Sequence, residues 1–290
     1  MKKLIVSLLH LLWRLGKSTL SIPERRRLAS AMLRLLLRQY LARGQSPGDM
    51  PSEDFLGYSI SSFDYATLTG LLDEIFVERV YEFKTTSRAP LILDCGGNIG
   101  LSVLYFKHRF PDARVICFEP DRAAFAKLLE NVSVNNLNGV EAHPCAVLDV
   151  QGPVSFYSDQ DNLNRVGMSV TRRLEDKGMR LDETRVEAVY LSSYFAETVD
   201  FLKLDVEGAE LRVLRELAGK QKLGLIQQMV IEYHYDLSNR DNSLGELLRL
   251  LEHSGFRYLV HSPFRSPFHA HADQPYSFLL YAYHAAAGRG

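Results

Sequence analysis

The sequence predicts an α/β fold whose core is a doubly wound, mostly parallel sheet. From residue 91 onward, short apolar runs alternate with segments whose apolar residues recur at helical spacing. A glycine-dense turn at 96–100 joins the first of these strands to the first helix, and acids stand at the ends of several strands. The chain of 290 residues is long enough for one such domain with additions. Its 46% apolar and 24% charged residues are typical of a soluble protein.

The elements follow from the alternation of these patterns. Seven core strands are expected at 91–94, 114–118, 140–147, 199–204, 225–232, 256–261 and 277–284. A further strand is expected at 154–158, and helices at 100–109, 121–136, 208–218 and 242–254. The short connection before the last strand predicts an antiparallel final hairpin. The polar stretch 159–182 has no clear pattern and is expected to be a flexible excursion.

The N-terminal segment differs in charge from the rest of the chain. Residues 1–45 carry ten Lys and Arg against a single acid, Glu24, and predict a basic amphipathic helical extension. The apolar run within it is too short to span a bilayer, which needs about 20 apolar residues. Peripheral contact of 1–45 with an anionic membrane is one prediction, and packing on the main domain with the arginines in water is the other.

The remaining boundaries follow from composition. Residues 46–89 are predicted to be a linker and helical lead-in, because 44–60 are rich in Gly, Pro and Ser. Residues 90–290 are predicted to be the main domain. Nucleic acid is not an expected partner, since no aromatic residues interleave with the arginines. Three cysteines at the ends of apolar runs predict buried free thiols, and therefore the cytoplasm or the inner face of its membrane.

The glycine turn predicts a nucleoside site without phosphate. Asp94 precedes Gly96, Asn98 and Gly100, and an acid at a strand tip repels pyrophosphate but accepts hydrogen bonds from an ammonium or a ribose. Glu119 follows Asp94 by 25 residues, which places a second acid on the adjacent strand tip to take both ribose hydroxyls. The dinucleotide spacing Gly-x-Gly-x-x-Gly is absent. S-adenosylmethionine fits this combination, and Ala146 is predicted to border its adenine pocket.

A second block, 201–214, predicts the catalytic groups. Asp205 ends an apolar strand and Glu207 follows it, so both are expected in the crevice at the carboxyl ends of the strands. Asp205 could act as a general base, an anchor for a substrate hydroxyl or a metal ligand. His234 ends the next strand, and a histidine that is neutral near pH 7 is a natural base for a hydroxyl.

These blocks resemble a known family. ILDCGGNIG, CFEP, LKLDVEGAE and IEYHY, within about residues 90–235, are similar to the FkbM family of S-adenosylmethionine-dependent methyltransferases. The resemblance implies a Rossmann-like class I methyltransferase core and O-methylation of a hydroxyl. It maps the cofactor loop onto Asp94, Gly96, Asn98 and Gly100, the ribose acid onto Glu119, and the acidic block onto Asp205, Glu207 and Glu210.

The acceptor and any metal are less defined. The expected acceptor is a hydroxyl of a sugar or glycoconjugate, and a lipid-linked sugar is favoured if residues 1–45 contact a membrane. The alternatives are a polyketide-type metabolite and a non-catalytic cofactor-binding adaptor. His269, His271 and Asp273 have a spacing that a divalent metal would accept, but their proline-rich surroundings favour a surface loop, and no metal is predicted. The sequence sets no oligomeric state.

Overall fold

A computed structural model describes residues 2–42, 50–159, 169–170, 181–235, 241–262 and 276–284. A seven-stranded sheet forms its centre, in the spatial order β11-β12-β10-β9-β3-β4-β5. Its strands are β3 (Leu91–Cys95), β4 (Arg114–Phe118), β5 (Val140–His143), β9 (Val199–Leu204), β10 (Ile226–Tyr235), β11 (Phe256–His261) and β12 (Tyr276–His284). Only β12 is antiparallel to its neighbours β10 and β11 within this sheet. The predicted doubly wound, seven-stranded sheet with an antiparallel last strand is confirmed.

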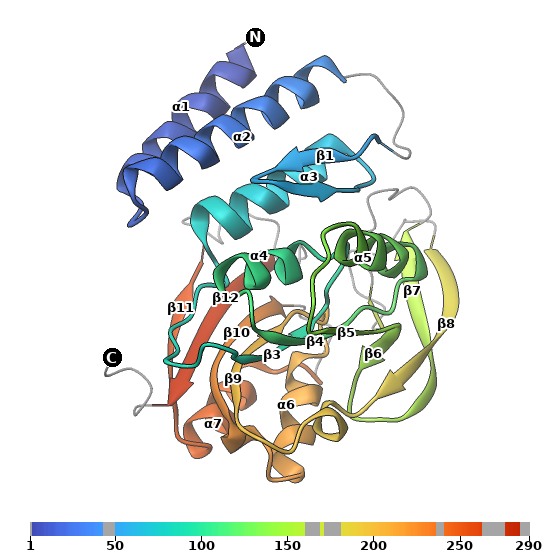
Figure 1. Cartoon of the computed structure of the whole chain (residues 1–290). Helices are drawn as coiled ribbons and strands as arrows, with labels where there is room; N and C mark the ends of the chain where they lie inside the picture. The colour runs from blue at the N-terminus through green and yellow to red at the C-terminus, as the bar shows by residue number, and fades with distance from the viewer. Residues whose placement is uncertain are drawn as a thin grey trace.

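Helices cover both faces of the sheet (Figure 1). On one face lie α4 (Leu101–Arg109) and α5 (Arg122–Val134), and on the other lie α6 (Glu210–Gly219) and α7 (Leu244–His253). Two short 3₁₀ helices, η3 (Leu191–Tyr194) and η4 (Leu223–Leu225), precede strands β9 and β10. The chain winds outward from β3 to β4 on one side and from β9 to β10 on the other. The carboxyl ends of β3 and β9 therefore form the switch point where such sheets bind ligands.

A smaller sheet stands beside the main one. It consists of β6 (Cys145–Val147), β7 (Gly152–Asp159) and β8 (Leu181–Val189), with β8 in the middle. The single strand predicted at 140–147 is wrong, because Pro144 divides it and the two halves join different sheets. Proline has no N–H for a ladder hydrogen bond, which explains the break. The predicted excursion at 159–182 overlaps the ends of β7 and β8, and most of it lies outside the described residues.

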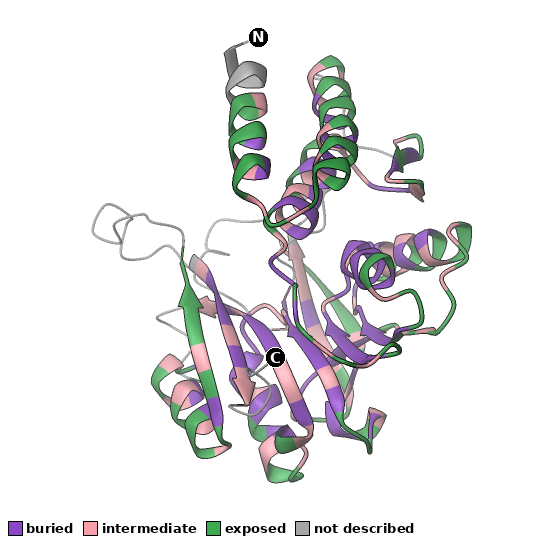
Figure 2. Cartoon of the chain, turned by 60° about the vertical axis from the view of Figure 1, so that its left-hand side comes forward, coloured by how far each residue is buried: buried purple, intermediate pink, exposed green. Residues whose placement is uncertain are grey.

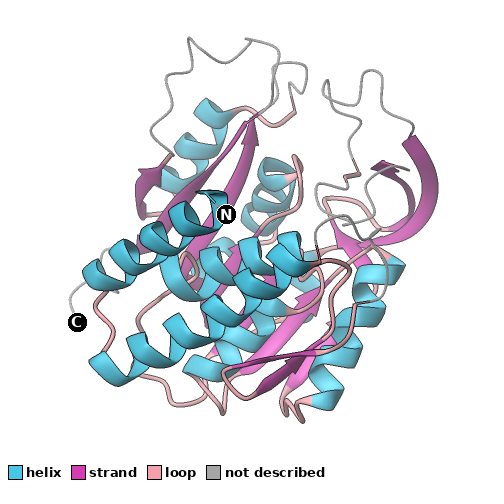
Figure 3. Cartoon of the chain, turned by 90° about the horizontal axis from the view of Figure 1, so that it is seen from above, coloured by secondary structure: helices cyan, strands magenta, loops and turns pink. Residues whose placement is uncertain are grey.

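The N-terminal region packs onto the main domain as a helical hairpin (Figures 2 and 3). It comprises α1 (Lys2–Lys17) and α2 (Ile22–Leu41), followed by the hairpin strands β1 (Glu53–Phe55) and β2 (Tyr58–Ile60), the helix α3 (Tyr65–Leu72) and a π-helix, η1 (Asp73–Glu78). Ser21 caps α2 through a reciprocal capping box with Glu24. The β1–β2 hairpin lies within the segment expected to be a linker.

One apolar cluster joins the hairpin to the sheet. Leu15 of α1 and Leu35 of α2 belong to the same buried cluster as Phe55 of β1 and Phe201 of β9. Arg14 adds a polar anchor, since its guanidinium lies 2.6 Å from carboxylates of both Asp73 and Glu78 in the π-helix. The N-terminal hairpin is therefore held to η1 by apolar packing and by the ion pairs of Arg14.

Two other expectations concern the thiols and the membrane. Cys95, Cys117 and Cys145 are buried and free, as predicted. Among the residues that the structure describes, no helix is both long and apolar enough to cross a membrane.

Candidate active site

A cavity opens at the carboxyl ends of β3 and β9, at the switch point of the sheet. Its floor is formed by the glycine turn and by the segment after β9, and its roof by α3 and η1. The predicted residues that line it are Gly96, Asn98, Glu119, Ala146, Asp205 and Glu207. Phe118, Val147 and Phe156 add an apolar wall near Ala146. The cavity therefore combines an apolar wall with a series of acids.

The glycine turn presents bare backbone to the cavity. Gly96 has φ +92°, and a Cβ there would lie 2.0 Å from the carbonyl oxygen of Asp205. A Cβ on Gly97 would lie 2.2 Å from Sγ of Cys117. The N–H groups of both glycines donate to the carbonyl of Phe118 at 2.9 Å. A side chain at either position would clash with these neighbouring atoms, so a ligand meets the main chain directly.

Glu119 links the glycine turn to the second strand. One carboxylate oxygen accepts the N–H of Asn98 at 2.8 Å, and the other accepts the N–H of Asp121 at 2.8 Å. Burial raises the pKa of Glu119 to about 7, although these two backbone hydrogen bonds oppose the shift. Its spacing from Asp94 predicted the contact with the turn, and each oxygen keeps a further lone pair for a ribose hydroxyl.

Asp94 does not face the cavity. Its side chain is 0% exposed, accepts a hydrogen bond from Ser102 Oγ at 2.5 Å and lies 3.5 Å from Nζ of Lys203. The predicted direct contact between Asp94 and a cofactor ammonium does not agree with this position. Gly100 is also absent from the lining, and instead begins α4 with φ +86° against Leu128. Asp94 and Gly100 therefore support the conformation of the glycine turn without lining the cavity.

Lys203 is a buried cation among the acids. Its ammonium donates to the carbonyl of Gly96 at 2.7 Å and to Oδ2 of Asp205 at 3.1 Å. Burial opposes its charge, but Asp205, and after it Tyr81 and Asp94, keep the pKa of Lys203 well above its ordinary value. The lysine thus ties β3 to the segment after β9. A lysine within the apolar run FLKL was the available signal for a buried cation, but no role was predicted for Lys203.

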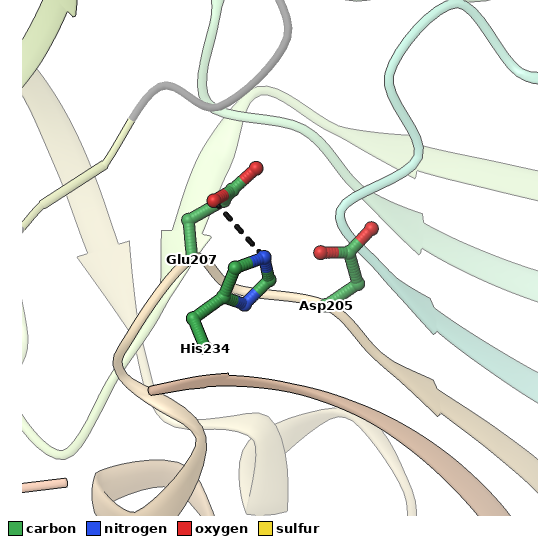
Figure 4. Close-up of side chains that lie close together, drawn as sticks. All are labelled: Asp205, Glu207 and His234. Carbon is green, nitrogen blue, oxygen red and sulfur yellow. Dashed lines mark ion pairs between the residues drawn. The ribbon is translucent and has the colours of Figure 1, made fainter. Parts of the chain in front are cut away.

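Asp205, Glu207 and His234 converge beside the cavity (Figure 4). One ligand-type atom from each lies within 4.8 Å of the others, and His234 Nε2 is 3.2 Å from Glu207 Oε2. Glu207 adopts a left-handed backbone conformation with φ +55°, which is uncommon for a residue with a side chain. The structure therefore brings together the three residues predicted to be catalytic.

His234 is held from its other side by a buried acid. Its Nδ1 lies 2.9 Å from Oε1 of Glu210, which is 0% exposed. Burial disfavours the charged ring, but Glu207 and then Glu210 and Asp205 outweigh it and raise the pKa of His234 to about 10. The prediction of a histidine that is neutral near pH 7 is therefore wrong for the protein without ligands, because the imidazolium already carries the proton that a base would accept.

Two further acids reach the same cavity. Glu232 of β10 lies 3.8 Å from His234 Nε2, and burial followed by repulsion from Asp205 raises its pKa to about 8. Strand alternation places Glu232 and His234 on one side of β10, which was the available signal. Glu74 comes from the π-helix η1, and burial raises its pKa too. Nothing in the sequence indicated that the distant segment 73–78 would roof the site.

His269, His271 and Asp273 lie outside the described residues. Within the described part of the chain, the Asp205, Glu207 and His234 group is the cluster with metal-ligand geometry.

Comparisons with known proteins identify relatives of this chain. The model of the "Methyltransferase FkbM domain" matches residues 94–258. "Methyltransferase 1" of Beauveria bassiana is 30% identical over 211 residues, which cover 67% of this chain and 83% of that protein. The "31-O-demethyl-FK506 methyltransferase FkbM" of Streptomyces tacrolimicus is 31% identical over 217 residues, which cover 64% of this chain and 80% of that protein.

A solved structure is also similar. The crystal structure of methyltransferase FkbM from Methylobacillus flagellatus aligns with a TM-score of 0.45 at 15% identity, covering 96% of this chain and 60% of that one. The family model spans more than half of this chain, including the glycine turn, Glu119 and the converging Asp205, Glu207 and His234. The chain belongs to the FkbM family of methyltransferases.

Proposed function

We propose that the protein transfers a methyl group from S-adenosylmethionine to a hydroxyl of a sugar or glycoconjugate. The observation that carries the proposal is the hydrogen bond between Glu119 and the backbone of Asn98, which places a carboxylate beside the bare glycine turn. Among the described residues, Lys203 is the one Lys or Arg in the cavity lining, and its ammonium already donates to the carbonyl of Gly96 and to Asp205. A ligand with ribose hydroxyls and positive charge is therefore favoured over a nucleotide.

The lining fits each part of S-adenosylmethionine. Glu119 can accept hydrogen bonds from the ribose, and the apolar wall of Phe118, Ala146 and Val147 suits the adenine. The ammonium and sulfonium groups of the cofactor would be attracted by Asp205 and the other acids of the cavity. Asp94 supports this site indirectly, since it holds Lys203 and Ser102 beneath the turn.

The acceptor hydroxyl is proposed to lie over Asp205 and Glu207. The cofactor supplies the methyl carbon, whose bond to sulfur breaks while the acceptor oxygen attacks it and the electron pair remains on sulfur. The hydroxyl proton passes to a carboxylate at this end of the cavity, which is Asp205 or, at a pH above its pKa of about 8, Glu232. Alignment of the two reactants and exclusion of water supply most of the acceleration.

A polyhydroxylated acceptor is favoured by the acids at this end of the cavity. Glu74, Glu207 and Glu232 enter it from three different elements, and carboxylates accept hydrogen bonds from several hydroxyls at once. The rival acceptor is a polyketide-type metabolite, since one relative is named as a methyltransferase of 31-O-demethyl-FK506.

We also propose that the N-terminal hairpin contacts an anionic membrane surface. Leu9, Leu12 and Trp13 of α1 are each more than half exposed, and Lys17 lies over the ring of Trp13. Apolar side chains flanked by a cation are typical of helices that lie at a lipid interface. A lipid-linked sugar would then be brought to the enzyme by the membrane.

Two assays test the proposed function. Isothermal titration with S-adenosylmethionine should show binding that Glu119→Ala weakens, because the substitution also leaves the N–H of Asn98 without its acceptor. A methyl-transfer assay should then show turnover with glycans or glycolipids. Lack of binding, or indifference to Glu119→Ala, would reject the cofactor site. Binding without turnover on any acceptor of the panel would favour an adaptor, and turnover on a macrolide alone would favour the polyketide alternative.

A further inference from the structure

The structure assigns a divalent cation site to Asp205, Glu207 and His234, with Glu210 and Asn242 as supporting residues. Two carboxylates and one imidazole converge at the acceptor end of the cavity. Such a mixed oxygen and nitrogen set suits a first-row cation such as Mn²⁺. The role of this site in methyl transfer rests on the proposed function, but the binding of the cation does not.

The distances fit a shared ion. Two ligand atoms bound to one cation, each at about 2.1 Å, lie about 3 Å from one another. Glu207 Oε2 and His234 Nε2 are already 3.2 Å apart, and the third ligand atom, from Asp205, lies within 4.8 Å of both. The Asp205 side chain is 23% exposed and its Oδ2 pairs with Lys203 Nζ at 3.1 Å, so the lysine and the cation would share this carboxylate.

The histidine is oriented as metal-binding histidines are. Its Nδ1 donates to Glu210 at 2.9 Å, which leaves Nε2 directed at Glu207 and Asp205. Metal-binding histidines commonly donate their second ring N–H to a carboxylate in this way. Glu210 is itself fixed, since it accepts the N–H of Gly208 at 2.9 Å and the side-chain amide of Asn242 at 2.7 Å. Both Glu210 and Asn242 are buried.

The backbone at Glu207 supports the same conclusion. Its left-handed conformation is followed by Gly208, with φ +99°, and Ser169 Oγ donates to the carbonyl of Glu207 at 2.6 Å. This turn directs the Glu207 carboxylate toward His234 rather than into solvent (Figure 4). A carboxylate that merely capped α6 would not need it, because Glu210 already accepts the Gly208 N–H at that helix terminus.

The cation defines the acceptor more closely. Three protein ligands leave positions open toward the cavity, which Asp205 and Glu207 line. Two neighbouring oxygens of one acceptor, as in a vicinal diol, fill such positions better than a single isolated hydroxyl. We therefore infer that the enzyme prefers the diol-bearing members of the sugar class.

The test uses Mn²⁺ and the full-length protein, without cofactor or acceptor. The electron paramagnetic resonance signal of free Mn²⁺ should fall as protein is added, and Glu207→Gln or Asp205→Asn should weaken binding by about 10–100-fold. Glu210→Gln should weaken it by a similar factor without removing a ligand. Glu141→Gln is the matched control, because Glu141 pairs with His143 at 2.8 Å on the surface without a third ligand.

The outcomes separate this site from the cofactor site. Titration with S-adenosylhomocysteine checks that each variant still folds and binds at the glycine turn. If wild type and Glu207→Gln remove the same amount of free Mn²⁺, or neither removes any, the cation site is overturned while the cofactor site stands. If Mn²⁺ binds as expected but S-adenosylhomocysteine does not, the proposed methyl transfer fails and the cation site stands.

Discussion

The two ends of the cavity differ in what holds their acids. At the glycine turn, both oxygens of Glu119 accept backbone N–H groups, and Gly96 packs against the carbonyl oxygen of Asp205. At the other end, Asp205 pairs with the side chain of Lys203 and Glu207 with that of His234. The first end is a fixed shape that recognises the donor. The second is made of side chains that can exchange protons and ligands, and it is suited to the reaction.

The largest effect is expected from filling the fixed end. Gly96→Ala would place a methyl group 2.0 Å from the carbonyl oxygen of Asp205 at a φ of +92°. A backbone clash at a strained φ costs about 3–5 kcal/mol and lowers the melting temperature by about 10 °C. Calorimetric titration should show that binding of S-adenosylhomocysteine is lost.

Gly245→Ala in α7 is the control for this substitution. Nothing lies within 4 Å of the Cβ it would add, so stability should stay the same or rise by up to about 1 kcal/mol. A Gly96→Ala protein with the melting temperature and affinity of wild type would show that the turn is not a fixed shape.

Changing the reactive end should affect turnover instead of donor binding. Glu207→Gln keeps the shape but removes the charge next to His234, and should lower kcat by about 100-fold. The dissociation constant of S-adenosylhomocysteine should stay within about twofold of wild type. Steady-state kinetics and titration check this pair of results. A loss confined to donor affinity would reverse the roles assigned to the two ends.

At the fixed end of the cavity, the titration of Glu119 should make stability and donor binding depend on pH. The pKa of Glu119 is raised to about 7, above its ordinary value, so the neutral acid predominates below that pH. Its contribution to folding stability is therefore present below the unfolded pKa and is lost as pH rises through about 7. Ribose hydroxyls donate to the ionised carboxylate, so donor affinity should rise by about tenfold between about pH 5.5 and pH 7.

Glu119→Gln identifies the group responsible. The variant should bind the donor more weakly, with an affinity that does not change over this pH range. If the pH dependence persists in Glu119→Gln, another group causes it and the ribose contact is not supported.

The smallest effect is expected from the hairpin, which is outside both ends of the cavity. Replacing Leu12 and Trp13 together by Ser removes exposed apolar area and should lower co-sedimentation with anionic liposomes by about fivefold. Turnover on a water-soluble acceptor should not change. Leu129→Ser on α5 is the control, since that side chain is 46% exposed but lies far from α1 in sequence. Equal co-sedimentation of all three proteins would reject the membrane contact.

The sequence predicted local features of the site better than its charge state. The turn at 96–100 and the spacing to Glu119 could be predicted because both depend on one strand–turn–helix–strand unit. The approach of His234 to Asp205 followed from parallel strands that end at one edge. The protonation of His234 could not be predicted, since it depends on three acids that converge only in the folded chain.

The roof of the cavity and strand β8 also could not be predicted from the sequence patterns. Glu74 reaches the site because a π-helix continues α3, and the periodicity of 63–83 does not distinguish that geometry from an ordinary helix. Strand β8 escaped prediction because most of its side chains are polar and exposed, so no alternation of apolar residues marks it. Tertiary packing decides both cases.

The crystal structure of the protein with S-adenosylhomocysteine tests the central claim most directly, since it locates the donor relative to both ends. The expected result is ribose hydroxyls about 3 Å from the Glu119 carboxylate and a sulfur atom that faces Asp205. A ligand whose ribose lies away from Glu119, or whose sulfur points away from Asp205, would contradict it.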